Sequence, residues 1–469
     1  MKIPLSPYLK SLLFVFLFSQ SLLGYSQTVT KLFDFDAANG KRAYGDLISD
    51  GIYFYGTTTE GGTYNKGVVF KLKIDGTDFM KLHDFNDTDG AKPYDGLTHI
   101  GTELFGVTLL GGPENEGVIF RLNTDGSSYT ILNNLSGNTD GSLPTGTLYF
   151  DGTFLYGTTY SGGSNAGGGT IYKLKPDGSD FTTIHSFSGS NPINGAQPQG
   201  ELIFDGIYFY GVTFNGGTNS KGIVYKIKPD GTGFTKLLDL IGANGVNNVE
   251  PSALLLHNGF LYGCGFLGGT NENGFIYRIS VQGSDYEILH DFDISSGTKP
   301  HCKLTFVNEY LYGSTTAGGL TGGGVLFKIK PDGSDYTVLY NFGTESGYNC
   351  WSSLLYRGNH LYGITASGGS NNDSGTIFQL DDGLPLGIPN FDKTAPISLY
   401  PNPVKDILYI TLTENKETKV KLYEATGKLI LEQSIYNSAH FDMGNFKTGV
   451  YIIEVGNKAY KVLKQDGGF

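Results

Sequence analysis

A short aromatic-glycine element recurs seven times along the chain, and it constrains the fold more than any other feature. Successive copies lie 50 to 54 residues apart, and each is followed by a pair of adjacent glycines and a Gly-x-apolar-aromatic segment. The copies are Tyr55-Gly56, Phe105-Gly106, Tyr156-Gly157, Tyr210-Gly211, Tyr262-Gly263, Tyr312-Gly313 and Tyr362-Gly363. A repeat of this length is one supersecondary unit, which buries its apolar face only by stacking on its neighbours.

Each unit is predicted to contain four short antiparallel strands. In the fifth copy, residues 252–257 lead through the tight turn Asn258-Gly259 into a strand over 260–266, and strands over 275–280 and 286–292 follow. Glycine accounts for 70 of the 469 residues and charged side chains for only 17%, so long helices are not expected. Units of this kind are typical of β-propeller blades, and seven copies predict seven blades.

The seventh unit lacks a fourth strand, because the pattern stops after Asp382-Gly383. A matching segment lies at the other end of the chain, where Val29 to Phe35 resembles Met80 to Phe85, the fourth strand of the first unit. Pairing of this N-terminal strand with the last unit closes the ring and removes the exposed sheet edges of an open array. We therefore predict an all-β chain with a seven-bladed β-propeller over residues 27–384, closed by the N-terminal strand.

Residues 1–26 have the pattern of a secretory signal peptide. Lys2 and Lys10 precede an apolar stretch from Leu12 to Leu23. Small residues occupy the positions before a cleavage site after Ser26. The stretch is shorter than the roughly 20 residues of a membrane span, although an uncleaved anchor is the alternative. No later segment is long and apolar enough to span a membrane, so the mature chain is expected to be soluble.

Beyond the repeats, residues 385–396 are predicted to be a Pro-containing linker and residues 397–469 a second, small domain. That domain opens on Tyr400-Pro401-Asn402-Pro403, turns at Ala425-Thr426-Gly427-Lys428 and has a late strand beginning Gly449-Val450-Tyr451. The order of these motifs resembles the C-terminal sorting domain of the type IX secretion system. The resemblance implies a small β-sandwich that directs export across the outer membrane, with the secretion machinery as a partner.

The repeat itself resembles the GloVer-type tandem repeats of bacterial secreted proteins, whose unit reads like Leu-Tyr-Gly-Thr-Thr-x-x-Gly-Gly. Residues Leu155 to Gly163 show this unit best. The family is named for its repeat, and the resemblance implies no particular activity. With the sorting domain, it implies a protein that is secreted and extracellular or anchored at the outer cell surface.

A single ligand site in a sevenfold scaffold has to be built from residues that break the repeat. The start of each first strand lines the central channel of a propeller, and the residue after the Pro position there differs among the copies. It is Tyr44, Tyr94, Thr145, Gln199, Ser252, His301 and Trp351. The four rings fall in consecutive blades of the closed circle. Two residues earlier stand Arg42, Lys92 and Lys299, which we expect on the same strand face.

Aromatic and cationic groups on one arc suit stacking on sugar rings and pairing with carboxylate or sulfate groups. We therefore predict a ligand-binding module for polysaccharide, built from these four rings and three basic residues. One alternative is ordinary packing of the channel mouth. Another is a polysaccharide lyase or glycosidase with Asp95, Glu250 and His301 as acid-base candidates, and a third is a structural surface protein. The sequence leaves the question of catalysis open.

Other classes of function are disfavoured. A formal net charge of -12 repels phosphate backbones, so no nucleic-acid partner is expected. The glycine-rich loops lack the Gly-Lys-Ser/Thr of a phosphate-binding loop, and no CxxC or HxxxH spacing suggests a metal site. No cofactor or metal is therefore predicted. The three cysteines, Cys264, Cys302 and Cys350, are expected to be free thiols, with a bridge between Cys302 and Cys350 as the alternative.

Overall fold

The computed structural model divides the chain into two compact units with the boundary between Pro385 and Leu386, and each is described by itself. In the first unit it describes residues 27–189, 191–241 and 249–382. In the second it describes residues 397–400, 404, 407–412, 418–424, 428–435, 438–444, 446–455 and 458–464. The predicted signal peptide and linker lie outside these residues. Within them, no helix is long and apolar enough to cross a membrane.

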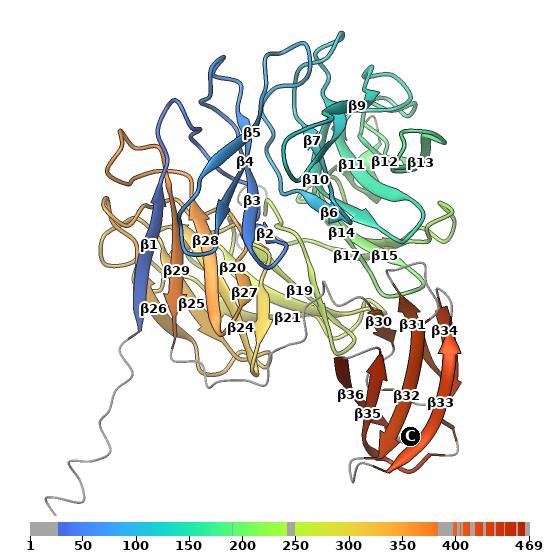
Figure 1. Cartoon of the computed structure of the whole chain (residues 1–469). Helices are drawn as coiled ribbons and strands as arrows, with labels where there is room; N and C mark the ends of the chain where they lie inside the picture. Colours follow the sequence, from blue (N-terminus) through green and yellow to red (C-terminus); the bar gives the residue numbers. More distant parts are fainter. Residues whose placement is uncertain are drawn as a thin grey trace, which may run out of the picture. The chain divides into compact units, whose positions relative to one another are not determined.

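The described strands of the first unit pair into seven antiparallel sheets, six of four strands and one of five (Figure 1). The first four sheets are β2 (Ile48–Ser49), β3 (Tyr53–Thr58), β4 (Val68–Lys73) and β5 (Met80–Asp84); β6 (Thr98–Ile100), β7 (Glu103–Thr108), β8 (Val118–Asn123) and β9 (Thr130–Asn134); β10 (Ser142–Phe150), β11 (Leu155–Ser161), β12 (Thr170–Leu174) and β13 (Thr182–Ser186); β14 (Ala196–Phe204), β15 (Phe209–Asn215), β16 (Ile223–Ile227) and β17 (Thr235–Asp239). A single turn of 3-10 helix, η1 (Pro192–Asn194), precedes β14.

The remaining three sheets continue the pattern. They are β18 (Leu255–His257), β19 (Phe260–Gly265), β20 (Phe275–Ser280) and β21 (Glu287–Asp291); β22 (Thr298–Pro300), β23 (Thr305–Val307), β24 (Tyr310–Ala317), β25 (Val325–Ile329) and β26 (Thr337–Asn341); and β27 (Leu355–Arg357), β28 (His360–Thr365), β29 (Thr376–Asp381) and β1 (Thr28–Asp34). The five-stranded sheet arises because β22 and β23 both pair with β24. The all-β prediction is confirmed, and the sheets follow the four-strand unit read from the repeat.

The N-terminal strand completes the last sheet of the first unit. β1 pairs antiparallel with β29 from Thr28 opposite Asp381 to Asp34 opposite Thr376, and Figure 1 shows the blue β1 beside the orange β29. Phe35, which follows β1, is fully buried. The two ends of the repeat region, whose paired residues are 342 to 353 positions apart in the sequence, therefore share one sheet.

The two recurrent motifs meet across neighbouring strands. The glycine of the aromatic-glycine step is the cross-strand partner of the ring in the Gly-x-apolar-aromatic segment, as in Gly106 with Phe120 and Gly157 with Tyr172. A Cβ added at Gly106 lies 2.6 Å from Cζ of Phe120, and one at Gly157 lies 2.4 Å from the Tyr172 hydroxyl. The glycine recurs because the ring of the next strand lies over its backbone.

The second unit contains two antiparallel sheets. One has the order β30 (Ile397–Tyr400), β31 (Ile407–Leu412) and β34 (Ser438–Asp442), and the other β33 (Leu429–Ile435), β32 (Thr418–Glu424), β35 (Gly449–Val455) and β36 (Lys458–Lys464). One cluster of buried apolar side chains draws on both sheets, with Leu408 and Ile410 from β31 and Val420 and Leu422 from β32. The alternation of buried and exposed residues along β32 and β35 places this core between the sheets.

Candidate functional site

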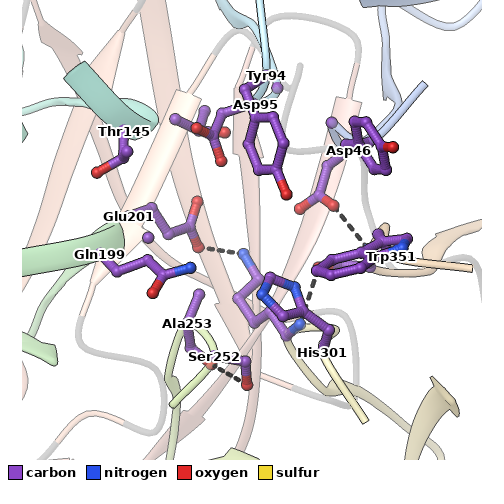
Figure 2. Close-up of a pocket in the computed structure, with 17 residues that line it drawn as sticks. Asp46, Tyr94, Asp95, Thr145, Gln199, Glu201, Ser252, Ala253, His301 and Trp351 are labelled. Atoms are coloured by element: carbon purple, nitrogen blue, oxygen red, sulfur yellow. Dashed lines mark hydrogen bonds and ion pairs between the residues drawn. The ribbon is translucent and has the colours of Figure 1, made fainter. Parts of the chain in front are cut away.

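A cavity of about 70 Å³ is lined by residues at or beside the first strand of each of the seven sheets. Every residue of the series aligned on the Pro position lies in its wall. These are Tyr44, Tyr94, Thr145, Gln199, Ser252, His301 and Trp351. Figure 2 shows the labelled residues arranged around one centre, with Thr145 and Gln199 on the side opposite His301 and Trp351. The structure thus brings the four predicted rings together at one site.

Five rings pack against one another in and beside the cavity wall. Tyr44 and Tyr94 stack with their centroids 4.9 Å apart, and Trp351 meets Tyr44 edge-on at 5.6 Å. His301 lies 4.3 Å from Trp351. Phe266, which the sequence reasoning did not select, stacks on Trp351 at 5.6 Å. The rings therefore form one continuous aromatic cluster rather than four separate platforms.

Two polar groups at the site differ in whether their hydrogen bonds are satisfied. The Trp351 indole N–H donates a hydrogen bond to Oδ1 of Asn349 at 2.7 Å, which fixes the orientation of the ring. On the opposite side, Oε1 of Gln199 is buried and has no hydrogen-bond partner within the described part of the chain. An unsatisfied buried acceptor is unfavourable by about 1 to 3 kcal/mol.

The three basic residues do not line the cavity beside the rings. Arg42, Lys92 and Lys299 have φ angles of 60°, 55° and 60°, a left-handed conformation that breaks the alternation of an extended strand. Their backbone N–H groups donate to the loop of the preceding sheet, as from Lys92 to the carbonyl of Lys66 at 2.8 Å. The Arg42 guanidinium pairs with Asp373 at 3.5 Å. The positive φ removes the extended backbone from which the shared strand face was predicted, and the role of these residues in binding stays a prediction.

Only two of the three acid-base candidates line the cavity. Asp95 and His301 line the cavity, and Glu250 does not. Glu250 occupies the left-handed position equivalent to that of the basic residues, with φ at 46°.

A second layer of charged side chains lies two residues further along the same segments. Asp46, Glu201 and Lys303 line the cavity, and the Lys303 ammonium pairs with the Glu201 carboxylate although 102 residues separate them. Asp46 accepts a hydrogen bond from the backbone N–H of Ser353 at 2.6 Å. Sequence reasoning missed these residues. The same search for repeat-breaking residues, moved two positions along the strand, selects all three.

Burial and mutual repulsion set the charges of the cavity. Burial raises the pKa of Asp95 to about 7, helped by the neighbouring carboxylates of Asp46 and Glu201 and opposed by the hydrogen bond from the Gly146 N–H, which is 2.8 Å long. Burial also raises the pKa of Asp46, and it lowers the pKa of His301 to about 4. At pH 7, His301 is therefore neutral and Asp95 is partly protonated.

We expect Asp95→Asn to stabilise the protein more at pH 8 than at pH 4. The pKa of Asp95 is about 7 in the folded state and about 3.9 in the unfolded chain, so the folded state holds the proton more tightly. Its contribution to stability therefore declines as pH rises from about 4 to 7 and is constant above. Asn mimics the protonated form at every pH. The difference in Tm between variant and wild type, measured at both pH values, checks this, and an equal difference contradicts it.

Neither a metal centre nor a disulfide is found at the site. Among the residues that the structure describes, no three His, Cys, Asp or Glu side chains are grouped to hold a metal ion. All three cysteines are free and buried. Instead of bridging to Cys350, the Cys302 thiol donates to the carbonyl of Ser314 at 3.4 Å, within its own sheet.

Comparison with protein families gives two matches that together span most of the chain. The Gloeobacter/Verrucomicrobia repeat matches three overlapping stretches, residues 17–168, 149–309 and 250–387. The secretion system C-terminal sorting domain matches residues 398–465.

Individual proteins show more limited similarity. A curated relative, ulvan lyase NLR42 from Nonlabens ulvanivorans, is 39% identical over 74 residues, which is 15% of this chain and 14% of the relative. A match of 74 residues covers only a small part of a chain whose repeat region alone spans residues 27–382. Among solved structures, the extracellular domain of a one-component system protein from B. thetaiotaomicron aligns over 93% of this chain and 57% of its own, with TM-score 0.50 and 14% identity. That similarity concerns the fold alone.

Proposed function

The chain belongs to the Gloeobacter/Verrucomicrobia repeat family and ends in a type IX secretion sorting domain, and from this premise we propose that it is an extracellular β-propeller that binds a glycan in its central cavity. The sorting domain implies secretion and a surface or extracellular location. The sorting domain gives the location of the protein, and the cavity supports the proposal that it binds a glycan.

Two observations support a closed seven-bladed ring. The pairing of β1 with β29 joins the first described strand of the repeat region to its last sheet. Each of the seven sheets also contributes residues at its first strand to one cavity, as expected when first strands surround a central axis. Four-stranded antiparallel sheets repeated in sequence are the units of such a ring.

The observation that carries the binding proposal is the aromatic cluster in the cavity wall. A strict sevenfold repeat would place equivalent residues around the axis, whereas Tyr44, Tyr94, His301 and Trp351 gather on one side with their rings in contact. Aromatic faces stack on the apolar faces of sugar rings, and the buried carboxylates and amide of the cavity supply hydrogen-bond acceptors for hydroxyl groups.

A glycan array combined with a reducing-sugar assay tests the proposal. We expect saturable binding of the mature protein to at least one class of extracellular polysaccharide, with no release of reducing ends. Absence of binding across an array of neutral, anionic and amino-sugar polysaccharides contradicts the proposal and leaves a structural role at the cell surface.

Catalysis on the same glycan is a second candidate, because Asp95 has a pKa of about 7, the range suited to a general acid or base. Glu201 and Asp46 line the same cavity. Release of reducing ends that is lost in Asp95→Asn, while binding persists, would establish an enzyme. Binding without such release assigns the site to recognition.

We expect Trp351→Ala to weaken glycan binding by about 1 to 3 kcal/mol, the scale of losing one stacking platform. Tyr64→Ala is the matched control, because Tyr64 is an aromatic residue outside the cavity wall with 56% of its surface exposed. Binding constants and Tm are measured for both variants. Equal losses of affinity in the two variants, or a large fall in Tm for Trp351→Ala, contradict a binding role for the cluster.

A further inference from the structure

Hydrogen-bond acceptors dominate the charged and amide groups of the cavity wall. Three carboxylates, from Asp46, Asp95 and Glu201, line it together with the amide of Gln199. The Oε1 of Gln199 is buried and lacks a partner within the described residues. Lys303 is the single Lys or Arg among the lining residues, and its ammonium is already paired with Glu201. A ligand group that donates several hydrogen bonds fits this wall better than one that accepts them.

The distribution of charge favours a cation as well. Three carboxyl groups share one ammonium, and repulsion from Asp46 and Glu201 adds to the effect of burial in keeping Asp95 partly protonated at pH 7. A positive charge entering the cavity relieves this repulsion, whereas a carboxylate or sulfate increases it. Lys299 lies outside the lining residues, with its ammonium over the Phe266 ring at 5.8 Å.

The aromatic cluster is compatible with a cation bound beside it. Tyr44, Tyr94 and Trp351 line the same cavity as the carboxylates, and the faces of such rings attract an ammonium group through their quadrupoles. At about 70 Å³ the cavity holds a few water molecules and not a whole sugar unit. A ligand therefore inserts one small substituent while its ring remains over the aromatic side chains.

We propose that this substituent is a protonated amine, so that the cavity recognises an amino sugar and discriminates against neutral and anionic glycans. The inference rests on the proposed function and names the ligand class of that same site. The ammonium lies among the carboxylates of Asp46, Asp95 and Glu201, and the sugar ring stacks on the aromatic cluster.

Calorimetric titration of the mature protein with three tetrasaccharides tests the proposal. The probes are a glucosamine tetramer, the N-acetylglucosamine tetramer and a galacturonate tetramer, which present an amine, a neutral amide and a carboxylate on similar rings. At pH 6.5 we expect the glucosamine tetramer to bind at least tenfold more tightly than either of the others. Equal affinity for the first two, or preference for the galacturonate tetramer, overturns the inference.

A substitution that removes one carboxylate charge localises the effect. Glu201→Gln is expected to reduce affinity for the glucosamine tetramer about tenfold and to reduce affinity for the N-acetylated probe by a clearly smaller factor. Glu103→Gln is the matched control. Like Glu201, Glu103 pairs with a cation, which is Arg121 at 3.0 Å, but it lies outside the cavity wall. Equal effects of the two substitutions overturn the assignment.

Proton linkage gives a second readout that does not depend on Glu201. A cation bound beside Asp95 lowers the pKa of its carboxyl, so binding near pH 7 releases protons. Titration in two buffers of different ionisation enthalpy measures this release. The titration uses a pH at which the amines of the free probe are already protonated, so that the probe takes up no proton on binding and the difference between wild type and Asp95→Asn isolates Asp95. We expect wild type to release more protons, and no difference contradicts the proposal.

The outcomes separate this inference from the proposed function. Binding of a neutral or anionic glycan, lost in Trp351→Ala, leaves the proposed function standing and removes the amino-sugar inference. Failure of every glycan to bind removes both.

Discussion

Deletion of residues 27–35 from the mature protein is expected to destabilise the repeat region by at least about 5 kcal/mol, or to prevent its folding. The deletion removes β1 and with it the ladder to β29. It also removes Phe35, which is fully buried against Phe70 with ring centroids 5.2 Å apart, and Phe33, which stacks on Phe79 at 4.6 Å. Loss of one buried Phe side chain alone is unfavourable by about 3 to 5 kcal/mol.

The measurement is thermal and denaturant unfolding of wild type, the deletion variant and Phe35→Ala. The single substitution should show part of the loss, because it empties the core while β1 remains paired. Addition of a peptide spanning Thr28 to Phe35 should restore part of the stability of the deletion variant, since it offers the missing edge strand again. An unchanged Tm after deletion would show that the pairing of β1 with β29 contributes nothing to the stability of the repeat region.

Gly146→Ala is expected to destabilise the protein by about 2 to 5 kcal/mol. Gly146 lies in β10 beside the cavity with φ at +82°, and a Cβ there meets the carbonyl oxygen of Gly200 in the next sheet at 2.2 Å. The left-handed conformation disfavours Ala by about 1 to 2 kcal/mol, and overpacking adds about 1 to 3 kcal/mol. The backbones of neighbouring first strands approach so closely here that only glycine fits.

Gly167→Ala separates the two contributions. Gly167 has nearly the same φ, +79°, but nothing lies within 4 Å of its added Cβ, so only the conformational effect of about 1 to 2 kcal/mol remains. Denaturant unfolding of both variants gives the comparison. Equal free energies of unfolding for the two variants contradict close packing of the first strands around the cavity.

The sequence predicted the sheets and the ring of lining residues well, because both depend on the repeat. Seven copies supply seven samples of each position, so the four-strand unit and the match of residues 29–35 to a fourth strand could be read directly. The Pro position then aligned all the first strands. As a result, residues as distant in sequence as Tyr44 and Trp351 were assigned to the same site, and their ring centroids lie 5.6 Å apart.

The parts that were missed depend on backbone detail and on contacts between distant segments. The assumption of an extended strand failed at Lys92, which has a positive φ although the X-Pro step that it forms with Pro93 ordinarily favours extended backbone. The pairing of Lys303 with Glu201 joins two different sheets, and the stacking of Phe266 on Trp351 comes from a loop after β19. No spacing rule within one repeat predicts either contact.

Fluorescence titration of Trp351 tests most directly whether the cavity is the binding site. Trp351 is the only tryptophan in the chain, so emission excited at the red edge of the absorption, where the 31 tyrosines do not absorb, reports on the cavity wall alone. A glycan that binds should change the emission saturably, with the same Kd as calorimetry gives, and Tyr94→Ala should weaken both signals together because its ring belongs to the same cluster. Calorimetric binding without any change in the emission of Trp351 would place the ligand elsewhere and contradict the account.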